Sequence, residues 1–179
     1  MRIPLACVAV CLGCFSALSA PAQQPAALSA VPANFQFAGS YTCEGSFRGG
    51  KVHRSTYAAA VILSGKWLQL SEQDVEPATG YLAEYLIGYD PQQKKLVEFD
   101  ANNFGAAVYT SDAGWSNGVL TMTSAIDPDP KAPYAANRFV FSLLGDNSFT
   151  VDWQVSKTPK LQWVQADHLV CTRSAAPGA

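Results

Sequence analysis

The sequence predicts an all-β protein, a single up-and-down antiparallel β-barrel of about ten strands. Short runs rich in β-branched and aromatic residues alternate with turn residues at fairly regular spacing, which is typical of all-β sandwiches and barrels. No amphipathic helical pattern is sustained along the chain. Two cysteines, Cys43 and Cys171, lie near the two ends of the strand-rich region, where a disulfide would bring the first and last strands together.

Composition supports one folded domain and excludes several classes of partner. The chain has 179 residues, enough for one domain, and its 49% hydrophobic content argues against intrinsic disorder. The formal net charge is −2, and the longest basic cluster is the pair Lys94-Lys95. We therefore expect no nucleic-acid partner and no binding to an anionic membrane surface.

Residues 1–22 have the parts of a secretory signal peptide. Arg2 provides the positive start, an apolar run follows, and Ala20-Pro21-Ala22 forms a small-x-small cleavage site. We expect cleavage after Ala22, with cleavage after Ala20 as the alternative. The apolar run is shorter than the roughly 20 residues of a spanning helix, so we expect no membrane span. The mature protein is thus predicted to be secreted or periplasmic.

A lipoprotein is the other reading of this leader, because Gly13-Cys14 ends a hydrophobic stretch. The residues before that site, Cys11 and Leu12, are poor ones for lipidation, and the apolar run up to Cys14 is short. Ordinary cleavage is therefore favoured over lipidation at Cys14.

Signal cleavage leaves two cysteines, Cys43 and Cys171, in the mature chain. Export favours oxidation, so a disulfide between them is expected; two buried free thiols are the alternative. Two cysteines are too few for a cysteine-rich zinc cluster, and no Cys-x-x-Cys motif remains after cleavage. We expect no metal and no cofactor.

The mature chain is predicted to divide into a flexible Pro/Ala spacer over 23–33, a barrel domain over 34–174 and a disordered tail over 175–179. Turn residues such as Arg48-Gly49-Gly50 and Asp90-Pro91 separate the strand-like runs. The expected strands are Ser40–Ser46, Val52–Leu63, Trp67–Val75, Tyr81–Tyr89, Leu96–Ala101, Ala106–Ser111, Val119–Ala125, Asn137–Leu144, Ser148–Val155 and Leu161–Arg173.

Period-two alternation supports these strands. Phe139, Phe141 and Leu143 share one face of their run, which places that face on a core. In the second run, Ala58-Ala59-Ala60 has helix propensity, but the residues around it favour a strand, so a strand is expected there.

The predicted disulfide favours a barrel over a sandwich. It requires the Cα atoms of the first and last strands to lie within about 7 Å. These strands become neighbours when a meander closes on itself, and closure also removes exposed strand edges. A barrel of this size is either filled by side chains or holds one small ligand.

Several motifs resemble those of bacterial domain-of-unknown-function family 1579. The stretch Gly39-Ser40-Tyr41-Thr42-Cys43-Glu44-Gly45 is similar to the opening Gly-x-Trp/Tyr-x-Cys-x-Gly of that family, and Gly88-Tyr89-Asp90-Pro91 followed by Asp100 and Gly105 is similar to its central signature. The resemblance covers most of residues 35–173. It implies a calycin-like barrel, related in shape to lipocalins, fatty-acid-binding proteins and haem-binding nitrobindins. It implies no activity.

The chain has two histidines. His168 lies in the last run and is faintly similar to the haem-ligating region of nitrobindins, but a partly buried histidine bonded to a neighbour is the favoured interpretation. His53, beside Arg54 and after a Gly-rich turn, is expected to be solvated. We therefore expect no catalytic residue from either.

Two groups of carboxylates also have an ordinary explanation. Glu72, Asp74 and Glu76 alternate along one strand and are expected to form a solvated acidic face rather than a catalytic pair. Asp127-Pro128-Asp129-Pro130 is expected to be a rigid turn rather than a calcium loop, because it lacks the ligand spacing of such loops. The sequence also lacks a Gly-x-Ser-x-Gly elbow, a His-Glu-x-x-His motif and a phosphate-binding Gly loop.

Aromatic residues are the more informative group, because they either line a pocket or fill the core. The two alternatives are evenly matched, since alternation assigns a face but not whether that face encloses space. The predicted ligand-binding residues are Tyr85, Phe99, Arg138, Phe141, Trp153 and His168.

Three functions remain open. The favoured one is a non-enzymatic exported barrel that binds a small apolar or amphipathic ligand. The others are an enzyme that uses His168 inside the barrel and a structural envelope protein with a filled barrel. An interior void of roughly 300 Å³ or more would favour the first two over the third. The oligomeric state is not predicted.

Overall fold

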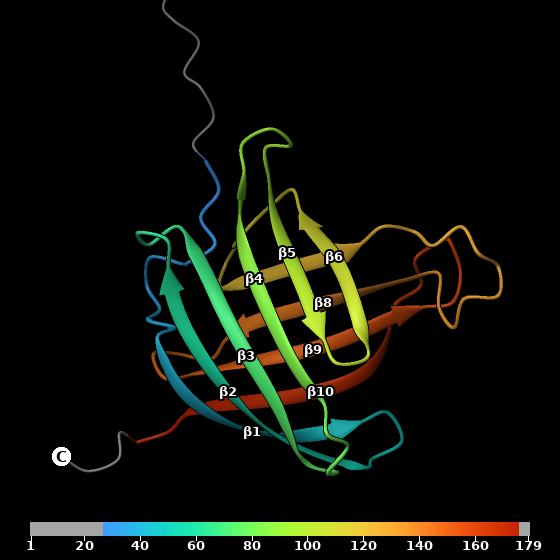
Figure 1. Cartoon of the computed structure of the whole chain (residues 1–179), viewed down its shortest axis with the longest axis horizontal. Helices are drawn as coiled ribbons and strands as arrows, with labels where there is room; N and C mark the ends of the chain where they lie inside the picture. Colours follow the sequence, from blue (N-terminus) through green and yellow to red (C-terminus); the bar gives the residue numbers. More distant parts are fainter. Residues whose placement is uncertain (1–26, 176–179) are drawn as a thin grey trace, which may run out of the picture.

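A computed structural model describes residues 27–175, and Figure 1 shows that the domain is built from strands. The signal peptide predicted over 1–22, the alternative lipidation at Cys14 and most of the predicted C-terminal tail lie outside the described residues. The strands are β1 (Gly39–Phe47), β2 (Val52–Ile62), β3 (Trp67–Glu76), β4 (Leu82–Asp90), β5 (Lys95–Asn102), β6 (Gly105–Ser111), β7 (Val119–Ser124), β8 (Ala136–Leu143), β9 (Ser148–Ser156) and β10 (Val164–Arg173).

The ten strands form a closed antiparallel barrel in which each strand pairs with its neighbours in sequence and β1 pairs with β10. The predicted all-β up-and-down barrel is therefore confirmed. The strand bounds agree with the sequence to within about one residue except in β10, which begins three residues later than expected, at Val164. The alanines of β2 are in a regular strand. Within 27–175, no helix has the length and apolar character needed to cross a bilayer.

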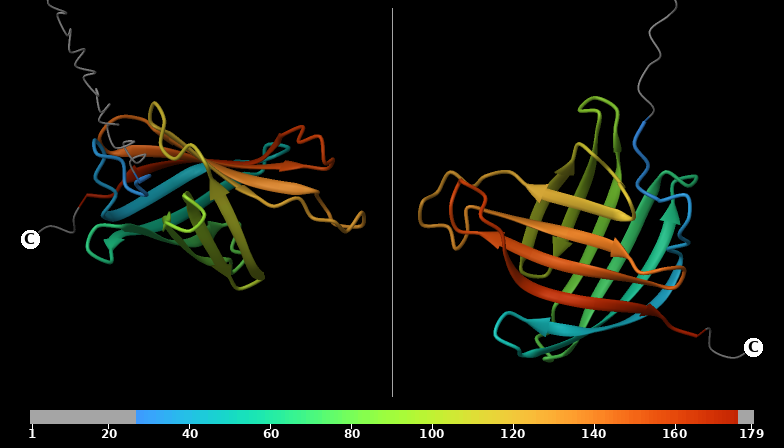
Figure 2. Two further views of the ribbon diagram at one scale, coloured as in Figure 1. Left: turned by 90° about the horizontal axis from the view of Figure 1, so that it is seen from above. Right: turned by 180° about the vertical axis from the view of Figure 1, so that it is seen from behind.

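The barrel has two walls, one formed by β3 to β6 and the other by β8 to β10, and their strands run in different directions (Figure 1). Figure 1 shows β3 to β6 running steeply across the view, whereas β8 to β10 cross behind them at a large angle. Figure 2 shows the same crossing from behind, with β8, β9 and β10 forming one continuous wall. Because the chain is a meander, the β1–β2, β3–β4, β5–β6, β7–β8 and β9–β10 connections share one end of the barrel. The opposite end holds both termini of the domain and the other four connections.

The N-terminal segment covers the end that holds the termini. Phe35 and Phe37 are buried there against Phe149, and Ala30 is 1% exposed. The indole N–H of Trp115, in the β6–β7 connection, donates a hydrogen bond to the Ala30 carbonyl (2.9 Å). Within the predicted flexible Pro/Ala spacer over 23–33, Ala30 is thus buried, and Leu28 and Val31 pack against the core.

The closure between β1 and β10 is covalent as well as hydrogen-bonded. Cys43 and Cys171 are paired in the register of the two strands and form a disulfide, with their Cα atoms 4.0 Å apart. Gly45, two residues further along β1, permits a close approach: a Cβ there would lie 1.7 Å from the His168 carbonyl oxygen. The predicted disulfide is confirmed, and it joins the first strand of the barrel to the last.

The central Gly-Tyr-Asp-Pro motif has a structural role. Gly88 lies under the indole of Trp67 on the paired strand, and a Cβ at this position would lie 2.2 Å from the ring. Asp90 begins the β4–β5 turn by accepting a hydrogen bond from the Gln92 backbone N–H (2.8 Å) and another from the Gln93 side chain (2.7 Å). These residues shape a strand and its turn.

We predict that removal of the disulfide strongly destabilises the barrel. The cysteines are 128 residues apart, and closing so long a loop stabilises the folded state by at most about 5 kcal/mol in the chain-entropy model. The double variant Cys43→Ala, Cys171→Ala should lose a large part of that free energy of unfolding in urea titrations. Reduced wild-type protein is the control and should behave like the variant. Rapid thiol labelling of unreduced native protein would contradict the bridge.

Candidate functional site

A cavity of about 600 Å³ occupies the barrel interior toward the end that holds the β1–β2, β3–β4, β5–β6, β7–β8 and β9–β10 connections. Its walls are formed mainly by aromatic side chains, with a histidine and several carboxyl groups among them. The lining residues that carry the chemistry are His53, Tyr57, Glu72, Asp74, Tyr81, Tyr85, Asp100, Tyr109, Tyr134, Asn137, Phe139, Trp153 and Asp167.

His53 on β2 is held between two carboxylates. Its Nδ1 lies 2.8 Å from Asp167 Oδ2 of β10, and its Nε2 lies 2.9 Å from Asp74 Oδ1 of β3. The ring also stacks on Phe47, with centroids 4.3 Å apart. His53 is 4% exposed, so the prediction that it is solvated is wrong. It faces inward because it is in the same strand phase as the buried Tyr57.

The two aspartates hold a proton on the imidazole. Burial lowers the pKa of His53, but hydrogen bonds and charges from Asp167 and Asp74 outweigh this effect and raise the pKa to about 9. Both ring nitrogens then carry a proton at neutral pH, and each donates to a carboxylate. His53 is therefore a buried cation rather than a free general base.

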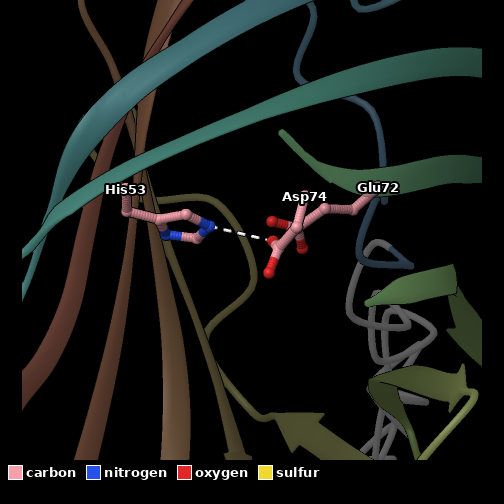
Figure 3. A group of neighbouring side chains, drawn as sticks. All are labelled: His53, Glu72 and Asp74. Carbon is pink, nitrogen blue, oxygen red and sulfur yellow. Dashed lines mark hydrogen bonds and ion pairs between the residues drawn. The ribbon is translucent and has the colours of Figure 1, made fainter. Parts of the chain in front are cut away.

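Glu72 lies beside this group, and Figure 3 shows its carboxylate and that of Asp74 on the same side of the His53 ring. The Tyr85 hydroxyl donates to Glu72 Oε2 (2.7 Å), and the Tyr81 and Tyr85 hydroxyl oxygens are 3.0 Å apart. Because Tyr85 gives its proton to Glu72, the Tyr81 hydroxyl is the donor to Tyr85. Burial raises the pKa of Glu72, and the tyrosine hydrogen bonds offset only part of that rise.

The prediction of a solvated acidic face over Glu72, Asp74 and Glu76 is therefore wrong for its first two members. Glu72 is 7% exposed and the Asp74 side chain is 6% exposed, whereas Glu76 is exposed. Glu72 and Asp74 continue the inward phase set by Leu70, which is fully buried. That phase was the signal in the sequence that could have placed them inside.

Asp100 of β5 is paired with Tyr85 in the strand register and lines the same cavity. It accepts one hydrogen bond, from the Asn102 side chain (3.0 Å). Burial raises the pKa of Asp100. Tyr81, Tyr109 and Tyr134 line the same cavity, and the charge of Asp100 adds to the burial that raises the pKa of all three hydroxyls.

Glu98, two residues before Asp100 on the same face of β5, is fully buried and neither of its carboxyl oxygens has a hydrogen-bond partner. Burial, reinforced by the charge of Asp100, raises its pKa well above the usual range. Glu98 is therefore a neutral acid in the barrel interior and contributes no charge to the cavity.

Asn137 of β8 organises the wall made by Tyr109 and Trp153. Its side-chain oxygen accepts hydrogen bonds from the Tyr109 hydroxyl (2.6 Å) and from the indole N–H of Trp153 (3.2 Å). Phe139, on the same face of β8, packs edge-on against Tyr109 and Tyr85, with centroids 5.2 and 5.6 Å apart. These contacts hold the aromatic rings in fixed positions.

The structure places two of the six predicted ligand-binding residues, Tyr85 and Trp153, in the cavity lining. Phe141 is 3% exposed and belongs to the packed core beside the cavity. The other three, Phe99, Arg138 and His168, do not line the cavity.

These three side chains point outward because they are out of phase with the inward residues of their strands. Phe99 is 47% exposed and stacks on Trp67, with centroids 6.3 Å apart. Arg138 lies over the Trp163 ring, 4.4 Å from its centroid, and its Nε donates to Gln154 (2.8 Å). His168 Nδ1 lies 2.7 Å from Asp152 Oδ1, so it is a partly exposed histidine bonded to a neighbour.

Sequence reasoning missed the polar residues of the cavity: His53, Glu72, Asp74, Asp100, Asn137 and Asp167. Each lies two or four residues from a buried apolar or aromatic side chain on the same face of its strand, as Asp167 lies two residues from Leu169. Asp127 and Asp129, by contrast, form the rigid turn that was expected, since each accepts a hydrogen bond from the backbone N–H two residues later (2.9 Å in both cases).

Binding a metal ion is one possible chemical role of His53, Glu72 and Asp74. One ligand atom from each of His53, Glu72 and Asp74 lies within 4.8 Å of the others. His53 could serve as a ligand only after losing its Nε2 proton, which is now donated to Asp74. The arrangement as it stands is an internally paired imidazolium.

Comparison with known proteins finds no matching family model and no matching curated protein. The function of the site is therefore inferred from its own geometry.

We predict that His53 stabilises the fold in a pH-dependent way. Its folded pKa of about 9 lies above the unfolded value near 6.5, so the stabilisation is complete below pH 6.5 and is lost as the pH rises through 9. The free energy of unfolding of wild type, relative to His53→Gln, should fall by up to about 3 kcal/mol between these limits. Urea titrations across this range measure the difference. An imidazole pKa near 6.5 by NMR would contradict the pairing.

Proposed function

We propose that this protein is an exported binding protein that holds one small amphipathic molecule inside its β-barrel. The observation that carries the proposal is the cavity of about 600 Å³, which is in the size range of small-molecule sites. Its aromatic walls suit an apolar body, and the polar groups among them suit a ligand that also has a hydrogen-bonding end.

The cavity volume favours ligand binding over a purely structural role. It exceeds the roughly 300 Å³ below which a filled barrel would be the better interpretation. The aromatic rings are fixed by contacts with one another and with Asn137 rather than collapsed into the space. A preformed space lowers the cost of ordering the site when a ligand binds.

Binding is also favoured over catalysis. The enzyme alternative relied on His168, whose side chain is outside the cavity and bonded to Asp152. His53 is inside, but both of its nitrogens are engaged and its pKa of about 9 keeps it protonated at neutral pH. A general base must be unprotonated near the working pH.

Export and family membership belong to the same proposal. A disulfide joining the ends of the domain suits an oxidising compartment, which supports the secreted or periplasmic location predicted from the leader. The Gly-Tyr-Asp-Pro turn and the opening Cys43 motif support a calycin-like member of the domain-of-unknown-function family 1579. That resemblance does not indicate which ligand the protein binds.

We expect the purified mature protein to bind the neutral fluorescent probe N-phenyl-1-naphthylamine, with a rise and blue shift in its emission. Ala107→Trp should abolish this signal, because Ala107 lines the cavity and the larger ring would occupy it. Val108→Trp is the matched control: Val108 is the next residue of β6, is 52% exposed and does not line the cavity. Equal loss in both variants, with folding intact by circular dichroism, would contradict binding inside the barrel.

A further inference from the structure

We propose that the ligand is an organic cation, a protonated amine on an aromatic or apolar body, and that its ammonium group binds at Asp100. This inference rests on the proposed function and names the chemical class of the ligand. Three independent features of the cavity carry it: its charge, its balance of hydrogen-bond donors and acceptors, and the aromatic rings around Asp100.

The ionisable groups of the cavity are predominantly acidic. Glu72, Asp74, Asp100 and Asp167 line it together with a single cation, His53. Of the residues the structure describes, no lysine or arginine lines this space. Low-dielectric walls focus the field of such groups, so the cavity attracts cations and disfavours anions.

His53, the one cation among the described lining residues, is already paired with carboxylates. His53 donates one N–H to Asp74 and the other to Asp167, so it leaves Asp100 without a cationic partner. The side chain of Asn102 makes the one hydrogen bond that the carboxylate of Asp100 accepts within 27–175. Asp100 is therefore the carboxyl group of the cavity that is most available to a ligand.

Most hydrogen-bond donors that line the cavity already donate to other protein groups, whereas several acceptors there have no donor among the described residues. Tyr81 donates to Tyr85, and Tyr85 donates to Glu72. Tyr109 and Trp153 both donate to Asn137. A ligand that enters this space therefore meets several carboxylate acceptors and few available donors, and an ammonium group, with three N–H donors and no acceptor, complements them.

Acceptors without partners remain on two sides of the cavity. One oxygen of Asp100 has no hydrogen bond among the described residues, and Asp167 Oδ1 is buried without a partner. A buried acceptor without a donor costs about 1–3 kcal/mol, which a donating ligand would recover.

The third feature is the aromatic environment of Asp100. Tyr81, Tyr109 and Tyr134 line the same cavity as Asp100, and Tyr109 lies on the same face of β6 as Ala107, which is paired with Asp100 in the strand register. Tyr81 is backed by a parallel stack with Phe104, and Tyr134 packs edge-on against Trp153. Electron-rich ring faces around a carboxylate favour a cation by cation–π attraction and also accept an apolar or aromatic body.

A metal ion at His53, Glu72 and Asp74 is the competing use of the negative charge. The imidazolium already neutralises part of that group through two close ion pairs, and Thr79 also donates to Asp74 (2.5 Å). A metal would have to displace the His53 proton and these partners. Asp100 carries no such internal cation, so the amine is favoured.

The test compares ligands that differ only in charge. The probes are 2-(1-naphthyl)ethylamine, its neutral isostere 2-(1-naphthyl)ethanol and the anion 3-(1-naphthyl)propionate, titrated into wild-type protein by calorimetry. We expect the amine to bind about tenfold or more tightly than the alcohol, since a charge-assisted hydrogen bond contributes about 1.5–3 kcal/mol. The acid should bind more weakly than the alcohol.

The variant Asp100→Asn keeps the shape of the side chain and removes its charge. It should reduce the amine-to-alcohol preference toward unity while leaving alcohol binding within a few-fold of wild type. Asp112→Asn is the matched control, because it makes the same charge change on an exposed residue that is paired with Lys95 outside the cavity. It should leave the preference unchanged.

The outcomes separate the inference from the proposed function. Equal binding of all three probes, or a preference for the acid, would overturn the cationic ligand but leave the binding barrel intact. Failure of all three probes and of the neutral fluorescent probe would overturn the binding function itself. Zn²⁺ binding that is lost in Glu72→Gln and that blocks the amine would assign the site to a metal and would also overturn the inference.

Discussion

The pairing of β1 with β10 is the constraint on which the rest of the structure depends. Every other neighbour in the sheet is also a neighbour in sequence, so local turns set those pairings, and only this one joins the two ends of the domain. The Cys43–Cys171 bond holds it covalently, and Gly45 allows the two backbones to approach closely. Without this contact the meander would be an open sheet with two exposed edges and no enclosed interior.

The two ends of the closed barrel differ. The segment around Phe35 and Phe37 packs into the end that holds the termini, which leaves the cavity toward the other end. The interior carries groups that are costly to bury: the His53 imidazolium, which lines the cavity, and the neutral acid Glu98, which is buried outside the cavity lining. The two aspartates beside His53 offset part of this cost, and nothing in the described chain pairs with Glu98. Perturbed ionisable groups that line a cavity are typical of functional sites rather than of filled cores.

The sequence predicted the fold almost completely but only part of the site. Period-two alternation, turn residues and the cysteine pair are local signals, so they were sufficient for ten strands and for closure. The site depends on which of the two alternating faces of each strand points inward. Polar residues were instead predicted to lie in solvent because they are polar. His53 and Glu72 are inward because their phase is that of Tyr57 and Leu70, and this counts for more than their polarity. Phe99 was predicted to line the pocket because it is aromatic, but its phase in β5 places it outside the barrel. Whether the interior is hollow depends on packing between distant strands, which alternation does not encode.

Hydrogen exchange at the backbone amides of β1 tests the closed barrel most directly. In an antiparallel strand, successive amides point to opposite neighbours, here β2 and β10. If the barrel is closed, consecutive amides across Gly39–Phe47 should all be protected by NMR in the oxidised protein, as strongly as those in the central strands. Fast exchange at every second amide, with protection only toward β2, would show β1 to be a free edge and would contradict the account.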